Sequence, residues 1–173
     1  MNILSKFGKY LTHVVHNVLE KETIDEKYIE YYEHIYKTCS VQFNTDTKNL
    51  YRIYLGLLEI IKLDIEILLI RTIFKEIDVL NFELDQIHDL WYTYFNKCII
   101  LEDIFIYLYE ESKIYIPESL HTKYNIRNIY IKLWENEIFN KLGLKIANKI
   151  SDILNNIRLD DSKRYKQINM INL

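Results

Sequence analysis

Residues 25–39, which read DEKYIEYYEHIYKTC, form the most informative stretch of this 173-residue chain. An α-helix turns by about 100° per residue, so the apolar residues of this stretch fall on two adjoining stripes. The first stripe holds Tyr31, Ile35 and Cys39, and the second holds Tyr28, Tyr32 and Tyr36, with Ile29 at its edge. Together the stripes cover an arc of roughly 160°, whereas packing against a single core needs only about 100°.

The extra width of this helix has two interpretations. The helix is either wedged between two neighbours in its own bundle, or it places one stripe on the core and presents the other to a partner protein. Tyrosine suits a binding surface because it combines a large area, few rotatable bonds and a polar tip. The pattern alone leaves both interpretations open.

Helical periodicity extends outward from this stretch over nearly the whole chain. Only 3 glycines and 1 proline are present, too few for the turns of a sheet protein or the glycine loops of a doubly wound fold. The sequence therefore predicts an all-α fold, a bundle of about six to seven helices. The expected helices cover residues 3–20, 25–39, 47–77, 82–97, 98–113, 126–139 and 144–158.

The sequence also predicts where the breaks between these helices lie. Polar residues 40–47 predict a loop, a second break is expected near 78–81, Pro117 interrupts the chain, and residues 141–143 predict a corner. Only a kink need separate the helices that meet at Cys98. We expect one domain over residues 1–158, followed by a polar, flexible tail over 159–173.

Charge and composition argue against several classes of protein. The net charge is −3, and the 22 basic and 25 acidic residues are scattered, so no basic block marks a nucleic-acid partner. The N-terminus lacks the apolar run of a signal peptide, and charges interrupt residues 55–73, so no membrane partner is expected. Cys39 and Cys98 are predicted to be buried, reduced thiols. These features favour an intracellular protein of the cytoplasm or nucleus.

Enzyme chemistry has no positive support in the sequence. The chain contains no nucleotide-binding glycine motif, no nucleophile elbow and no zinc-protease motif. His13 and His16 form the only pair with metal-like spacing, and no third ligand stands nearby. We therefore expect a non-catalytic protein with no catalytic residues, no cofactor and no metal site.

A second helix, residues 99–111 (IILEDIFIYLYEE), is also apolar on more than one side. Its broad core face consists of Ile100, Leu101, Ile104, Phe105 and Leu108. Ile99, Ile106 and Tyr109 fall on the opposite side. A helix that is apolar nearly all round is either fully buried or partly an interface.

These residues carry a resemblance to the cullin family. Segment 28–39 resembles the second helix of the first cullin repeat, with the approximate pattern Y-x-x-L-Y-x-x-V-Y-x-x-C and Tyr31 in the leucine place. Further blocks follow in the family's order, from residue 7 to residue 158. They include Leu50-Tyr51-Arg52, then Trp91 and Tyr94, then Leu101, Ile104, Tyr107 and Leu108, and finally Trp134, Phe139, Leu142, Ile146, Ile150, Leu154 and Arg158.

The resemblance implies a function in protein binding. Cullins are elongated scaffolds whose first repeat binds a BTB/POZ-fold adaptor through its second and fifth helices. That adaptor is an F-box adaptor, elongin C or a BTB substrate receptor. Carried over by position, the candidate adaptor-binding residues are Tyr28, Ile29, Tyr32, Tyr36, Tyr107 and Glu110. The chain departs from the family at Glu110 and Glu135, where cullins commonly carry basic residues, and this puts the choice of adaptor in doubt.

The resemblance also sets an expectation about what the chain lacks. Nothing after Arg158 resembles the cullin region that recruits a RING subunit, so we expect no RING binding. A chain of this kind would act as a competitive decoy for a host ubiquitin ligase, of the sort that a virus or parasite encodes. A fragment or reduced member of an ordinary ligase scaffold is the plainer interpretation. The alternative class is a helical assembly protein that acts through homo-oligomerisation without a ubiquitin role.

Overall fold

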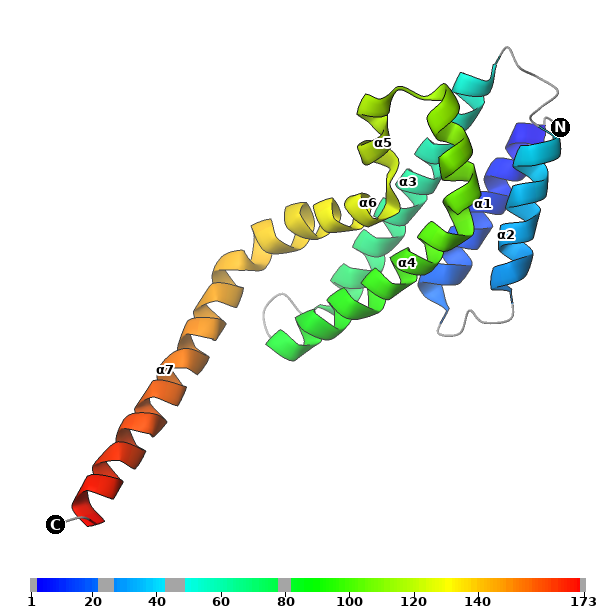
Figure 1. Cartoon of the computed structure of the whole chain (residues 1–173). Helices are drawn as coiled ribbons and strands as arrows, with labels where there is room; N and C mark the ends of the chain where they lie inside the picture. Colours follow the sequence, from blue (N-terminus) through cyan, green and yellow to red (C-terminus); the bar gives the residue numbers. More distant parts are fainter. Residues whose placement is uncertain (1–2, 22–26, 43–48, 78–81, 172–173) are drawn as a thin grey trace. The chain divides into compact units, whose positions relative to one another are not determined.

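The computed structural model describes residues 3–21, 27–42, 49–77 and 82–171 of the chain, and these are helical almost throughout (Figure 1). In chain order the elements are α1 (Ile3–Glu20), α2 (Tyr28–Lys37), a π-helical segment (Thr38–Gln42), α3 (Leu50–Glu76), α4 (Leu84–Tyr115), α5 (Glu118–Tyr124), α6 (Ile126–Leu133), a second π-helical segment (Trp134–Phe139) and α7 (Asn140–Ile171). The predicted all-α class is confirmed. The chain divides into two compact units, Met1–Trp134 and Glu135–Leu173.

The first unit is a bundle in which α1 packs on α3 and α4, and α2 packs on α4. Its helix α1 has the limits that the sequence predicted for residues 3–20. The apolar residues of α1 recur every three or four positions and are buried, namely Phe7, Leu11, Val14, Val15 and Val18. The side chain of Lys97 in α4 donates a 2.8 Å hydrogen bond to the Leu19 carbonyl, which lies near the open C-terminal end of α1.

Helix α2 contributes its first stripe to the same core. Tyr31, Ile35 and Cys39 are all buried, and the Tyr31 hydroxyl accepts a 2.9 Å hydrogen bond from Asn17 of α1. The helix does not stop at Cys39, because the π-helical segment carries it through Gln42. The prediction of a loop is therefore wrong at residues 40–42, and the rest of that loop lies outside the described residues. Ser40 donates a 2.7 Å bond to the Tyr36 carbonyl, which satisfies a backbone acceptor in this last turn.

Helix α4 is one continuous helix where the sequence suggested two, 82–97 and 98–113. No glycine or proline interrupts residues 84–115, and buried residues recur along its whole length. It ends at Tyr115, and only the extended residue Ile116 stands between it and the proline that was expected to break the chain. The predicted break near residues 78–81 lies outside the part of the chain that the structure describes.

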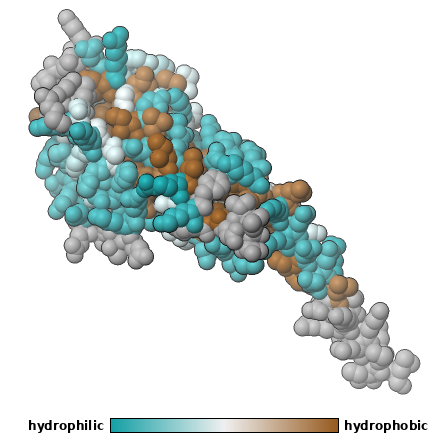
Figure 2. Space-filling model, turned by 180° about the vertical axis from the view of Figure 1, so that it is seen from behind, coloured by the Kyte–Doolittle hydropathy of each residue, from teal (hydrophilic) through white to brown (hydrophobic). Residues whose placement is uncertain are grey.

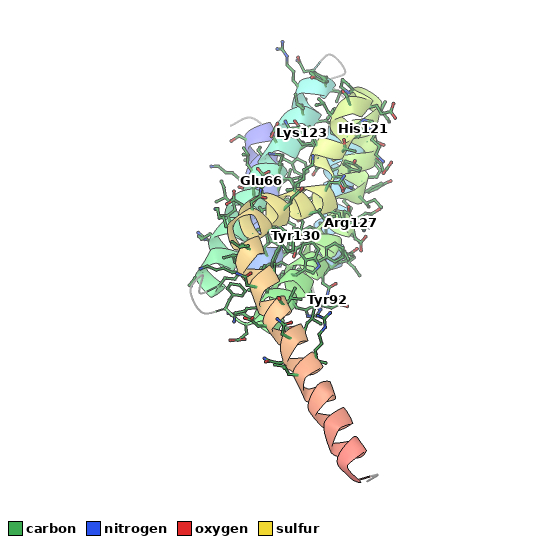
Figure 3. The ribbon with its side chains drawn as sticks, turned by 90° about the vertical axis from the view of Figure 1, so that its left-hand side faces the viewer. Glu66, Tyr92, His121, Lys123, Arg127 and Tyr130 are labelled. Carbon is green, nitrogen blue, oxygen red and sulfur yellow. The ribbon has the colours of Figure 1, made fainter. Side chains whose placement is uncertain are left out.

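A short helix that the sequence reading missed, α5, joins α4 to α6. Tyr109 of α4 donates a 2.8 Å hydrogen bond to the His121 carbonyl, and Glu59 of α3 accepts bonds from Lys123 (2.6 Å) and Tyr124 (2.7 Å). The side-chain oxygen of Asn125 accepts a 3.0 Å bond from the Asn128 amide and so caps α6. Figure 3 shows His121 and Lys123 on α5 and Arg127 at the start of α6.

An aromatic cluster fixes α6 on α4. The ring centroid of Trp91 lies 5.0 Å from that of Tyr130 and 5.1 Å from that of Trp134. The hydroxyl of Tyr130, a residue labelled in Figure 3, donates a 2.5 Å hydrogen bond to the Trp91 carbonyl. Trp134 and Tyr130 are fully buried, so these rings form the end of the first unit's core.

The second unit is built around α7. The expected corner at residues 141–143 is wrong, because α7 passes through Gly143 without a break. Lys141 pairs with Glu137 one turn earlier. Helix α7 continues to Ile171, beyond the domain limit expected at residue 158. The division into a domain over 1–158 and a flexible tail over 159–173 stays a prediction.

Candidate protein-binding surface

The second stripe of α2 lies at the surface of the first unit. Tyr28 and Tyr32 are half-buried, Tyr36 is 44% exposed, and Ile29 is 66% exposed. We use the name tyrosine surface for these four residues together with the half-buried Tyr107 of α4. The two stripes thus have different environments, since one is in the core and the other is accessible to solvent. This geometry agrees with the interpretation in which α2 places one stripe on the core and leaves the other accessible.

Ring contacts join the tyrosine surface across the two helices. The ring centroids of Tyr36 and Tyr107 lie 4.6 Å apart with the rings nearly perpendicular, and those of Tyr32 and Tyr36 lie 6.4 Å apart and stacked. Such contacts order the rings before any partner arrives. The structure therefore brings Tyr32, Tyr36 and Tyr107 into one row, although Tyr36 and Tyr107 are 71 positions apart in the sequence.

Two phenols of this surface, those of Tyr28 and Tyr107, have a raised pKa. Partial burial raises the pKa of Tyr28, and the negative charge of Asp103 raises it further. Partial burial also raises the pKa of Tyr107, with contributions from the charge of Glu111 and a hydrogen bond to it. A neutral phenol both donates and accepts hydrogen bonds. The tyrosine surface accordingly offers apolar area with hydrogen-bonding tips.

Glu110, the remaining candidate residue, lies one turn beyond Tyr107 on α4. Its carboxylate is exposed and forms a 2.6 Å ion pair with Lys113, whose ammonium also lies 4.7 Å above the Tyr109 ring. This pairing offsets part of its charge. The part of Glu110 in adaptor binding stays a prediction.

Sequence reasoning only partly resolved the outer side of α4. It grouped Ile106 with Tyr109, and both side chains line one cavity beside α6. Their environments nevertheless differ, because Tyr109 also donates a hydrogen bond to α5. Ile106 is 49% exposed and stands between the exposed Asp103 and Glu110, and we call these three residues the α4 ridge. The sequence could not show this difference, because the short helix α5 was not recognised.

Exposed apolar side chains also occur away from the tyrosine surface. Figure 2 shows hydrophobic residues on the face that is hidden in Figure 1, and Leu63 and Ile67 of α3 are both exposed. Exposure alone therefore does not identify a binding site. The distinguishing feature of the tyrosine surface is its row of mutually packed aromatic rings.

The described residues contain no group of three or more His, Cys, Asp or Glu side chains that could hold a metal ion. None of the described helices is long and apolar enough to cross a membrane. His13 instead contacts the Asn17 amide at 2.7 Å. Cys39 and Cys98 are buried free thiols, as predicted, and burial raises the pKa of Cys39 to about 12. A thiol with so high a pKa is a poor nucleophile at neutral pH.

Comparison with known protein families gives a match to the cullin α-solenoid domain over residues 9–172. Searches of curated proteins and of solved structures gave no match. The family match spans nearly the whole chain and agrees with the order of sequence blocks and with the helical architecture. The chain therefore belongs to the cullin family, as a helical protein-interaction module of the α-solenoid type.

Proposed function

We propose that the tyrosine surface binds a BTB/POZ-fold adaptor of a cullin-RING ubiquitin ligase. The observation that carries this proposal is the solvent-accessible row of packed tyrosines on α2 and on the second half of α4. These parts correspond to the second and fifth predicted helices, which the resemblance assigns to adaptor binding. Membership of the cullin family supports a scaffold role and a partner of this class.

The chemistry of the surface suits a moderately apolar partner. Buried aromatic anchors carry most of the free energy at protein interfaces, and Tyr is among the residues enriched there. Tyr36 already contacts Tyr107, so ordering it on binding costs little side-chain entropy. The ion pair of Lys37 with Glu33 (3.0 Å) and that of Lys113 with Glu110 lie at the rim, where they contribute mainly to orientation and selectivity.

A titration of the purified chain against representative adaptors tests the proposal. Isothermal calorimetry with an F-box adaptor, elongin C and a BTB domain should show saturable binding to at least one class. Tyr36→Ala should weaken that binding. The matched control is Tyr92→Ala, which removes a tyrosine of α4 that is 60% exposed and lies outside the tyrosine surface. Equal binding by both variants would place the contact elsewhere.

Sharing an adaptor surface has a further consequence, which is competition with other cullins. If the chain occupies the adaptor site that another cullin uses, excess chain should displace that cullin from a preformed adaptor complex. We propose that the chain acts as such a competitor. Failure to displace a labelled cullin at saturating concentration, by a chain that binds the same adaptor, would rule out the competitor role while leaving adaptor binding intact.

Self-association is the second candidate function, and the exposed Leu63 and Ile67 of α3 favour it. Clustered apolar residues on a surface often mark contacts between proteins. Light scattering over a range of concentrations distinguishes the two. A monomer that binds an adaptor supports the first proposal, whereas a stable dimer broken by Leu63→Lys would support the second.

A further inference from the structure

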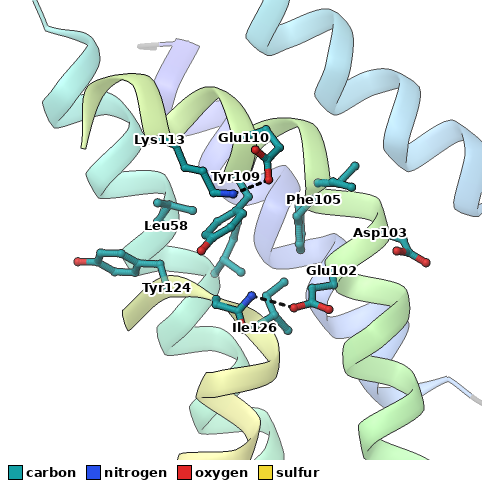
Figure 4. A pocket seen from close by; sticks show the side chains of 12 residues that line it. Leu58, Glu102, Asp103, Phe105, Tyr109, Glu110, Lys113, Tyr124 and Ile126 are labelled. Carbon is teal, nitrogen blue, oxygen red and sulfur yellow. Dashed lines mark hydrogen bonds and ion pairs between the residues drawn. The ribbon is translucent and has the colours of Figure 1, made fainter. Parts of the chain in front are cut away.

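A cavity of about 290 Å³ lies between α3, α4 and α6, on the other side of the α4 ridge from α2 (Figure 4). Its floor is apolar and consists of Leu58, Ile61, Phe105 and Ile126, all of which are buried residues. Pockets for drug-sized ligands usually begin at about 300 Å³. The volume therefore suits one large apolar side chain of a partner protein better than a cofactor.

The rim of this cavity is acidic. Glu102, Asp103 and Glu110 line it, against a single ammonium from Lys113. Glu102 accepts hydrogen bonds from Asn125 (2.9 Å) and Arg127 (2.7 Å), which hold α6 against α4. Lys113 is engaged with Glu110.

Asp103 differs from its two acidic neighbours. It is exposed, and it forms no ion pair with any described residue. Its negative charge adds to the effect of partial burial in raising the pKa of Tyr28 on α2. A cation brought to this edge of the cavity would therefore meet a carboxylate that forms no ion pair with the lysines and arginines that the structure describes.

We propose that this cavity is a second docking site, which takes a segment of a partner protein in which a large apolar residue stands next to a lysine or arginine. The apolar side chain would cover the floor formed by Phe105, Leu58 and Ile126, and its burial would provide the attraction. The neighbouring cation would pair with Asp103, a charge-assisted contact at the mouth of a partly desolvated site. Charge complementarity thus selects basic segments over acidic ones.

Methyl NMR of the full chain with short peptides tests this proposal without any adaptor. The probe is the blocked peptide GSFKSG, compared with GSFESG, in which glutamate replaces the lysine. The first peptide should shift the methyl signals of Ile61 and Ile126 in a saturable way, and the second should bind several-fold more weakly. The methyl signal of Ile114, which is exposed on α4 and does not line the cavity, should not move. No saturable shift at millimolar GSFKSG, or equal shifts with both peptides, would overturn the proposal.

Two variants locate the contact. Leu58→Trp places a larger side chain on the floor and should abolish the peptide-induced shifts. Asp103→Asn alters only an exposed residue, so it should fold normally and weaken GSFKSG several-fold. Unchanged binding by Asp103→Asn would overturn the assigned role of this carboxylate even if Leu58→Trp did not fold. Tyr36→Ala, which should weaken adaptor binding, should keep peptide binding, so the two proposals fail independently.

Discussion

At the scale of single residues, the two stripes of α2 show how neighbouring tyrosines take different roles. Tyr31 is buried and accepts a hydrogen bond from Asn17, so its hydroxyl is satisfied inside the bundle. Tyr32, the next residue, is half-buried and stacks on Tyr36 at the surface. One residue of helical rotation thus separates a core position from a candidate binding position.

Replacing Tyr28 and Tyr32 together by alanine should remove adaptor binding and leave the fold nearly intact. Each truncated anchor at an interface costs about 2–4 kcal/mol of binding free energy, while neither side chain is fully buried in the free chain. Calorimetric titration measures the first effect and thermal unfolding by circular dichroism the second. Loss of folding in the double variant would favour a structural role for these tyrosines.

Trp134→Ala, in contrast, should destabilise the fold. The side chain is fully buried against Trp91 and Tyr130, so its removal leaves a cavity and should lower the free energy of unfolding by about 3–5 kcal/mol. Urea denaturation measures the change, with Tyr92→Ala as the exposed aromatic control. A loss of less than about 1 kcal/mol would be inconsistent with a core role for this tryptophan.

At the scale of elements, α4 organises the first unit because its faces meet different neighbours. Leu101, Ile104 and Leu108 are buried in the core, Tyr107 contacts Tyr36 of α2, and Tyr109 bonds to α5. The sequence predicted these apolar faces from their periodicity. It could not predict which neighbour covers each face, because that depends on the tertiary arrangement of helices distant in sequence.

Two features of the helices could not be predicted from the spacing of apolar residues. Helix α5 has 7 residues, too few for a repeat of apolar positions to be recognised. Gly143 was interpreted as a corner, but a helix tolerates an isolated glycine at a cost of about 1 kcal/mol. The candidate residues on α2 were predictable from the double stripe. The cavity was not, since its floor combines residues from three helices and its wall depends on α5 and α6.

Asn125→Ala should loosen the attachment of α6. The side chain of Asn125 caps α6 through the Asn128 amide and donates to Glu102 of α4, so its loss should destabilise the fold by about 1–2 kcal/mol. Chemical denaturation compares this variant with Asn96→Ala, which removes an exposed asparagine within α4. Equal stability of the two variants would show that the cap contributes little.

At the scale of the whole molecule, buried phenols couple stability to alkaline pH. Burial raises the pKa of Tyr10 to about 12 and also raises the pKa values of Tyr54 and Tyr130. A phenol with a raised folded-state pKa contributes stability that is complete below its unfolded pKa of about 10 and is lost as the pH rises further. The free energy of unfolding should therefore fall above about pH 10, and Tyr54→Phe should make that fall shallower. A free energy that stayed constant or rose there would contradict the predicted burial of these phenols.

Hydroxyl-radical footprinting of the tyrosines, with and without a bound adaptor, tests the central claim most directly. The claim is that the tyrosine surface is accessible in the free chain and is covered by the partner. In the complex, oxidation of Tyr32, Tyr36 and Tyr107 should fall, while that of the exposed Tyr92 should stay unchanged. An adaptor that binds the chain but leaves these three tyrosines as reactive as before would contradict the account.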